Sequence, residues 1–303
     1  MGGRLSNYLQ KFHNVHVGTR RQVTPEILAA LGQVVSYIDH DSLLLERAFP
    51  DSIDVLIHLA ALNDRECIRN PSLAMEVNVN QTRRVIDNAI KKKVKRIVYF
   101  STVHVYGKMQ GDITEGTCPD PHSTYAITHK LAEDHLISAC TSDRVEGIVL
   151  RMSNAFGSPV LKETNCWHLI VNDACMQATG QGFILLNSNG CQRRDFVPLL
   201  HVERIARFFT EVELLGRECI YNATSGNTMT VLEMVNLVAG VYSEEFGPRI
   251  PIKLPEGCIH IDEPPVRIIP DGLKGLGLEI GSNYLDELKG LINYCRSNLN
   301  VNG

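Results

Sequence analysis

Short apolar runs alternate with longer segments of helical periodicity through the first half of the chain. The runs are rich in β-branched and aromatic residues and predict buried strands, and the segments between them predict helices. The expected strands cover His13 to Val17, Val34 to Ile38, Val55 to Leu59, Arg96 to Phe100 and Gly147 to Leu150, and the clearest helix runs from about Ser72 to Ile90. This alternation predicts right-handed βαβ units, and so a doubly wound α/β fold whose parallel sheet has helices on both faces.

The pattern changes after Arg151, where glycine and proline become frequent and the segments shorten. A chain of this length can hold one large α/β domain and a smaller lobe. We therefore expect the larger domain at residues 1–156 and the smaller, C-terminal lobe at residues 157–303.

The first residues predict a helix that no strand precedes. Leu5, Tyr8, Leu9 and Phe12 recur at i, i+3, i+4 and i+7, which is the spacing of an amphipathic helix. The predicted sheet thus lacks its first strand, and a gap there would leave backbone groups unpaired on both sides. We expect the reading frame to extend upstream of Met1 and to encode that strand; the alternative is a variant of the fold that does without it.

Composition narrows the classes of function. A net charge of −4 gives no case for a nucleic-acid partner. The sequence shows no apolar run of membrane-spanning length and no signal-peptide pattern. Its nine cysteines are scattered and form no C-x-x-C pair, so neither a zinc site nor a disulfide framework is indicated. We expect a protein of the reducing cytoplasm without a metal.

Two segments carry the candidate chemistry. Thr102 follows the strand that ends at Phe100, at the edge where open α/β sheets bind ligands. Tyr125 begins a helix that Ser123 or Thr124 would cap, with Ile127 and Leu131 near its expected apolar face. A strand-end hydroxyl and a tyrosine at the start of the next helix indicate an oxidoreductase, in which the phenol gives or takes a proton while a hydride moves.

These segments resemble the extended short-chain dehydrogenase/reductase family, in its NAD-dependent epimerase/dehydratase branch that acts on nucleotide sugars. The resemblance implies that Thr102 and Tyr125 are catalytic. The family's lysine, four residues after the tyrosine, is replaced here by His129. Glu133 matches the family's acidic residue, which keeps the register and argues that His129, and not Lys130, takes the place of the lysine. His129 would then be the third catalytic residue.

The resemblance also implies a bound NADP or NAD, held by residues 1–156. Thr19, Arg20 and Arg21 follow the strand whose end usually carries an acid for the NAD ribose; the arginines suit the 2′-phosphate of NADP or are two solvated loop residues. Asp39 would meet the adenine edge or serve as a loop or cap carboxylate. The remaining expected cofactor residues are Gly2, as the last glycine of the dinucleotide turn, Leu59, Ala60, Ala61, the supporting Asn78, Tyr125 and His129.

Residues 157–303 would mainly form the substrate lobe. Asn154 lies in a motif similar to the family's R-x-x-N-x-[YF]-G and would contact substrate, as would Thr102. Arg194, in a segment similar to R-D-F-V, would face a nucleotide diphosphate. Arg267 would be a second diphosphate contact or a surface arginine. Val103 and His104 stand where dehydratases of the family carry an acid pair, which disfavours dehydration.

The resemblance thus implies an NAD(P)-dependent enzyme acting on a nucleotide sugar, as a 4-keto reductase or an epimerase. Reduction ranks first because a neutral histidine helps a tyrosine that donates a proton more than one that must ionise. The alternatives are a dehydrogenase of a non-nucleotide alcohol, and a cofactor-binding protein that has lost catalysis. Whether the protein forms a homodimer is left open by the sequence.

Overall fold

The computed structural model describes residues 1–32, 34–37, 49–143, 145–213, 219–257, 263–281 and 283–299. Its first half contains α1 (Gly2–Leu9), β1 (His16–Thr19), α2 (Pro25–Leu31), β2 (Val34–Tyr37), β3 (Val55–His58), α4 (Asp64–Arg69), α5 (Pro71–Ala74), the π-helical turn η1 (Met75–Gln81), α6 (Thr82–Lys91), β4 (Arg96–Thr102), the 3₁₀ turn η2 (Val103–Tyr106), β5 (Gly111–Ile113), α7 (Thr124–Asp143) and β6 (Glu146–Met152). The second half contains β7 (Asn154–Phe156), α8 (Ile170–Gln181), β8 (Ile184–Leu185), β9 (Arg193–Pro198), α9 (Leu199–Glu211), β10 (Ile220–Ala223), β11 (Thr228–Thr230), α10 (Val231–Phe246), β12 (Ile252–Lys253), β13 (Val266–Ile268), α11 (Asp271–Gly275) and α12 (Leu285–Asn298).

A parallel sheet in the order β10-β6-β4-β3 forms the centre of the fold. Strands β1 and β2 pair with each other in parallel, as a separate two-stranded sheet. The predicted strands all recur, although β1 begins three residues later than expected, at His16 rather than His13. Ile38, the expected end of the second strand, lies outside the described residues. Within the described residues the sheet is therefore in two parts, and the expected α/β fold with a parallel central sheet is confirmed.

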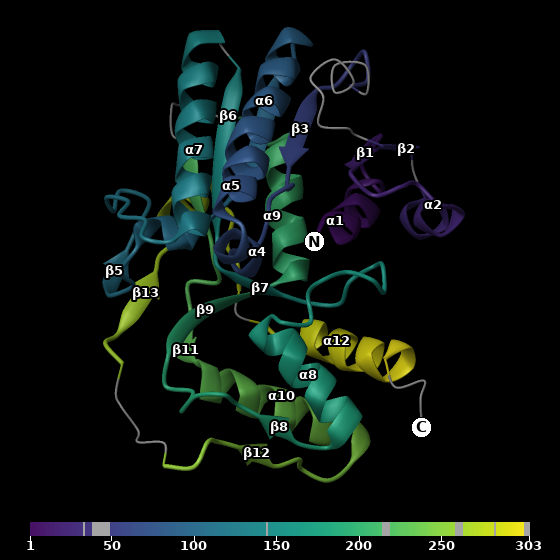
Figure 1. Ribbon diagram of the computed structural model, residues 1–303, viewed down its shortest axis with the longest axis vertical. Helices are drawn as coiled ribbons and strands as arrows, with labels where there is room; N and C mark the ends of the chain where they lie inside the picture. Colours follow the sequence, from purple (N-terminus) through teal and green to yellow (C-terminus); the bar gives the residue numbers. More distant parts are fainter. Residues whose placement is uncertain are drawn as a thin grey trace.

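Helices cover both faces of this sheet because β4 buries side chains alternately on its two sides. Ile97 and Tyr99 pack in a cluster with residues of α6 and α7, whereas Val98 and Phe100 pack in a cluster with residues of α9 and with Leu5 of α1. All seven positions of β4 are buried, as expected for a central parallel strand with helices on both faces. Figure 1 shows α6 and α7 side by side along the sheet, in agreement with the contacts between them.

A second apolar cluster lies in the lower part of the molecule, where α8, α10 and α12 pack together (Figure 1). Not all of residues 157–303 belong to this lower part. Helix α9 covers the central sheet, and β10 is one of the strands of that sheet. The boundary between residues 156 and 157 remains a prediction. Among the described residues, no helix has the length and apolar character needed to cross a membrane.

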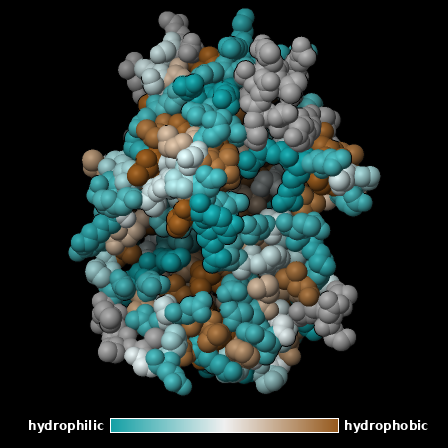
Figure 2. Space-filling view, in the orientation of Figure 1, coloured by the Kyte–Doolittle hydropathy of each residue, from teal (hydrophilic) through white to brown (hydrophobic). Residues whose placement is uncertain are grey.

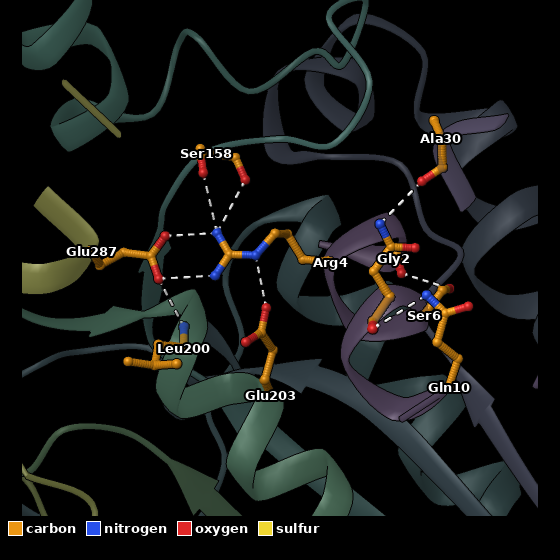
Figure 3. A network of polar contacts seen from close by, with 10 residues as sticks. Gly2, Arg4, Ser6, Gln10, Ala30, Ser158, Leu200, Glu203 and Glu287 are labelled. Atoms are coloured by element: carbon orange, nitrogen blue, oxygen red, sulfur yellow. Dashed lines mark hydrogen bonds and ion pairs between the residues drawn. The ribbon is translucent and has the colours of Figure 1, made fainter. Parts of the chain in front are cut away.

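Arg4 joins the first helix to two helices far along the chain. Its guanidinium forms ion pairs with Glu203 of α9, at 2.7 Å, and with Glu287 of α12, at 2.8 Å, and it also donates to Ser158 (Figure 3). Glu287 accepts a further hydrogen bond from the backbone N–H of Leu200. The network fixes α1 against α9 and α12, which positions the N-terminal end of α1 beside the site described next.

Candidate active site

A cavity of about 2230 Å³ opens at the carboxyl ends of β1, β3 and β4. Figure 2 shows the face hollowed between the upper and lower parts of the molecule, with mostly hydrophilic residues around the opening. Most of the residues that the sequence predicted for cofactor and substrate line it: Gly2, Thr19, Arg20, Arg21, Leu59, Ala60, Ala61, Thr102, Tyr125, His129, Asn154 and Arg194. Open parallel sheets bind ligands at this edge.

Thr102 and Tyr125 meet at the cavity because a strand ends where a helix begins. The hydroxyl of Thr102 accepts the backbone N–H of His104 at 3.2 Å, which starts the 3₁₀ turn η2. Ser123, one of the two expected caps, accepts the N–H of Ala126 at 3.2 Å and begins α7. Burial raises the pKa of Tyr125 to about 12, and a hydrogen bond with Thr102 opposes that rise. Tyr125 is therefore a protonated phenol at neutral pH.

His129 lies one helical turn after Tyr125 and faces the same cavity. Its Nδ1 is 2.7 Å from the hydroxyl of Tyr99, and its ring lies edge-on to Tyr125 with centroids 4.5 Å apart. Burial lowers the pKa of His129 to about 3, with smaller contributions from the nearby His58 and His104. The imidazole is thus neutral, and its buried Nε2 has no hydrogen-bond partner among the described residues.

The next residue, Lys130, points away from the cavity. It forms an ion pair with Asp134 on the same helix and is not part of the cavity lining. The structure therefore brings His129, and not Lys130, to the cavity.

Glu133 and Arg151 form a buried ion pair behind the site. The carboxylate is fully buried and accepts two hydrogen bonds from the guanidinium, at 3.1 and 2.8 Å. Glu133 also accepts the hydroxyl of Ser101, the residue before Thr102. Arg151 in turn lies over the ring of Tyr106, 4.7 Å from its centroid. The pair ties α7, β4 and β6 together, and so holds Tyr125 and Thr102 at a fixed separation.

Asn78 supports the site without lining it. Its side-chain oxygen accepts the N–H of Leu62 at 2.7 Å, and its amide group donates to Thr128 of α7 at 3.1 Å. Asn78 belongs to the π-helical turn η1 and is fully buried. It thereby connects the loop after Ala61 to the helix that carries Tyr125, and its expected role at the cofactor stays a prediction.

The expected substrate residues fall into two groups. Asn154 lines the cavity and donates to the backbone carbonyl of Asp195 at 3.0 Å, and Arg194 lines the same cavity. Arg194 also faces His104, since its charge adds to burial in lowering the pKa of that histidine. Arg267 is not in the cavity lining; it is exposed and paired with Asp112 through two hydrogen bonds. The structure thus supports the interpretation of Arg267 as a surface arginine.

Asp39, which was expected at the adenine edge of the cofactor or as a loop or cap carboxylate, lies outside the described residues.

Tyr99 is a residue of the site that the sequence patterns did not indicate. Its hydroxyl is a polar group inside a strand whose neighbours Val98 and Phe100 are apolar, and this was the available signal. Residues of a strand alternate between faces, so Tyr99 points away from the face of Val98 and Phe100, and the structure places α7, the helix that carries His129, on its side. Pairing the two would have required the strand and the helix to be placed in space.

Comparison with known proteins places the chain in a family. Residues 1–212 match the NAD dependent epimerase/dehydratase family. The chain is 22% identical over 267 residues to D-erythronate dehydrogenase of Haemophilus influenzae. The aligned region covers 82% of this chain and 80% of that protein. It is 24% identical over 196 residues to an uncharacterised UDP-glucose epimerase of Bacillus subtilis, covering 63% of this chain and 59% of that protein.

A solved structure shares the fold over nearly the whole chain. UDP-glucose 4-epimerase of Thermotoga maritima, solved with UDP-glucose, superposes with a TM-score of 0.79 at 21% identity and covers 98% of this chain and 96% of that one. The family resemblance expected from the sequence is therefore confirmed: the chain belongs to the NAD dependent epimerase/dehydratase family.

Proposed function

We propose that the protein is an NAD(P)-dependent oxidoreductase or epimerase of a nucleotide sugar, and that reduction of a 4-keto sugar is its favoured reaction. The observation that carries the proposal is a protonated Tyr125 beside Thr102, with a neutral His129 one helical turn away at the same cavity. Similarity to epimerases of UDP-sugars supports the substrate class.

The cavity suits a dinucleotide. Its lining runs from Gly2 at the start of α1, past Arg20 at the end of β1 and Leu59 after β3, to Tyr125 and His129. The unpartnered Nε2 of His129 is a buried polar atom that needs a ligand to complete its hydrogen bonding. When bound, a nicotinamide cofactor would supply or accept the hydride. His129 would bind its ribose in place of the family's lysine.

The side chains at the cavity would then have separate roles in proton transfer to the substrate and in binding it. Tyr125 donates its phenolic proton to the oxygen of the sugar carbonyl as that carbon is reduced. Thr102 holds the same oxygen through its hydroxyl and fixes the phenol beside it. Asn154 and Arg194 would hold the substrate farther along, because a guanidinium matches the oxygens of a diphosphate. His129 contributes no positive charge, so Tyr125 ionises with difficulty and oxidation is disfavoured.

The His129→Lys variant is expected to raise oxidation more than reduction. Oxidation needs the phenolate, whose fraction rises about tenfold per pH unit below the Tyr125 pKa of about 12, whereas reduction needs the phenol and is insensitive to pH in that range. A nearby ammonium lowers a tyrosine pKa, so the basic limb of the oxidation profile should move to lower pH. Lys130→Ala is the control and should leave both rates unchanged. An unchanged oxidation profile in His129→Lys, with activity destroyed in Lys130→Ala, would contradict the assignment.

Arg20 and Arg21 are expected to make the protein prefer NADPH to NADH. Both are exposed at the cavity, directly after Thr19, whose hydroxyl accepts the N–H of Arg21 at 3.1 Å. A guanidinium paired with the 2′-phosphate should give a preference of roughly tenfold in dissociation constant. The double variant Arg20→Gln, Arg21→Gln should remove it. Equal affinities in the unaltered protein would show that these are solvated loop residues and would favour an NAD-dependent epimerase.

We also propose a cytoplasmic protein and a homodimer. The cysteines of the described residues are all free, which suits a reducing compartment. Sedimentation measurements on the purified protein would determine the oligomeric state.

A panel of substrates tests the proposed function. The protein is incubated with NADP or NAD and with UDP-, dTDP- and GDP-hexoses, their 4-keto derivatives, or D-erythronate, and products are identified by mass spectrometry and NMR. We expect turnover of a nucleotide sugar without a 4-keto-6-deoxy product, because no acid pair follows Thr102. Turnover of D-erythronate alone would favour a dehydrogenase of a non-nucleotide alcohol, which the similarity to that enzyme supports as the second candidate. Cofactor binding without turnover would indicate lost catalysis.

A further inference from the structure

Tyr99 and His129 form a buried pair whose protons can be assigned. Tyr99 is 1% exposed, and its hydroxyl has Nδ1 of His129 as its one hydrogen-bond partner among the described residues, at 2.7 Å. The ring of His58 stacks on Tyr99 with centroids 5.9 Å apart, and His58 is itself held by the hydroxyl of Thr82 at 3.0 Å. Tyr99 is therefore fixed in orientation as well as buried.

The phenolic proton decides which tautomer of His129 is present. A buried hydroxyl must donate its proton, and Nδ1 of His129 is the one hydrogen-bond partner of Tyr99 in the part of the chain that the structure describes. Nδ1 then carries a lone pair, and in a neutral imidazole the proton must be on Nε2. In the opposite arrangement Nδ1–H would donate to Tyr99, and the phenolic proton would be buried without an acceptor. Burial also keeps His129 from taking up a second proton.

The free nitrogen of His129 consequently becomes a donor. Nε2 is buried and has no partner among the described residues, and His129 lines the cavity. We propose that Tyr99 is a positioning residue, which fixes His129 in the Nε2–H tautomer so that the histidine presents one neutral hydrogen-bond donor to a ligand hydroxyl. As regards the identity of that ligand, a cofactor ribose, the inference rests on the proposed function. The assignment of the tautomer does not.

Nitrogen-15 NMR of the protein labelled at histidine tests this directly. The long-range coupling pattern distinguishes the two tautomers, and comparison with His129→Gln identifies the signals of His129. The unaltered protein without ligand should show protonated Nε2 and unprotonated Nδ1. Protonated Nδ1 would overturn the proposal without need of any further variant.

Tyr99→Phe removes the phenolic proton, and His129 should then shift toward the Nδ1–H tautomer or a mixture. The dissociation constant of the variant protein for the dinucleotide should rise about tenfold, because the molecules with the Nδ1–H tautomer lose one hydrogen bond to the ligand. Tyr106→Phe is the matched control: that buried hydroxyl donates to Asn222, also at 2.7 Å, and lies outside the cavity lining. It should change neither measurement.

The outcomes separate the two claims. An unchanged His129 tautomer in folded Tyr99→Phe would overturn the role of Tyr99. The expected tautomer and its shift, in a protein that binds no dinucleotide, would support the role of Tyr99 and count against the proposed function instead.

Discussion

Replacing Tyr125 by phenylalanine is expected to abolish turnover in both directions. The variant keeps the aromatic ring, and so the edge-on contact with His129, but loses the proton that the reacting oxygen needs. General acid–base catalysis of this kind contributes roughly 10²- to 10⁴-fold to a rate. The measurement is the rate constant for hydride transfer in a single turnover, followed by absorbance of the reduced nicotinamide.

Binding of the dinucleotide should survive the same substitution, which separates loss of chemistry from loss of the fold. Thr102→Ala should give a smaller loss, because the hydroxyl of Thr102 supports Tyr125 but carries no proton to the substrate. A Tyr125→Phe variant with more than about a tenth of the original rate would require another acid. His104, whose ring lies 6.2 Å from that of Tyr125, would then be the next candidate.

The Arg151→Met variant is expected to lose about 3–5 kcal/mol of unfolding free energy, because it leaves the carboxylate of Glu133 buried without its cation. The side chains of Arg151 and Glu133 are 2% and 0% exposed, so water cannot replace the lost hydrogen bonds. Chemical denaturation measured by circular dichroism gives the value.

Arg267→Met provides the matched control. It removes another arginine that makes two hydrogen bonds to a carboxylate, but the pair with Asp112 is exposed, and water solvates Asp112 when its partner is gone. The denaturation midpoint should not change. If Arg151→Met were as stable as Arg267→Met, the buried pair could not be what holds α7 against β4 and β6.

The strands and the strand-end motifs could be predicted because they depend on local sequence. Val55–His58 and Arg96–Thr102 are apolar runs bounded by polar residues, and a parallel sheet brings their carboxyl ends to one edge. The position of Thr102, Tyr125 and His129 at one cavity follows from that rule together with helical spacing.

The orientation of α7 could not be predicted in the same way. Ile127 and Leu131 were expected on the apolar face, but they are 40% and 41% exposed. The buried face instead carries Thr128, His129 and Glu133. These polar side chains are buried because each has a partner on another element, and a hydrophobicity pattern contains no information about such partners.

Arg267 shows the converse limit. Its place after two prolines allowed a contact with substrate, yet β13 pairs with β5 and sets the side chain beside Asp112. Because β5 and β13 are far apart in the sequence, no local pattern could reveal that pairing.

Transfer of a labelled hydride tests the central claim most directly. The protein is mixed with a UDP-4-ketohexose and a reduced nicotinamide cofactor that carries deuterium at the transferring position, and the sugar is analysed by NMR and mass spectrometry. The account predicts deuterium at C4 of the product, at a rate that is lost in Tyr125→Phe and unaffected in Lys130→Ala. Bound cofactor that never transfers deuterium to the sugar, with any nucleotide tried, would contradict it.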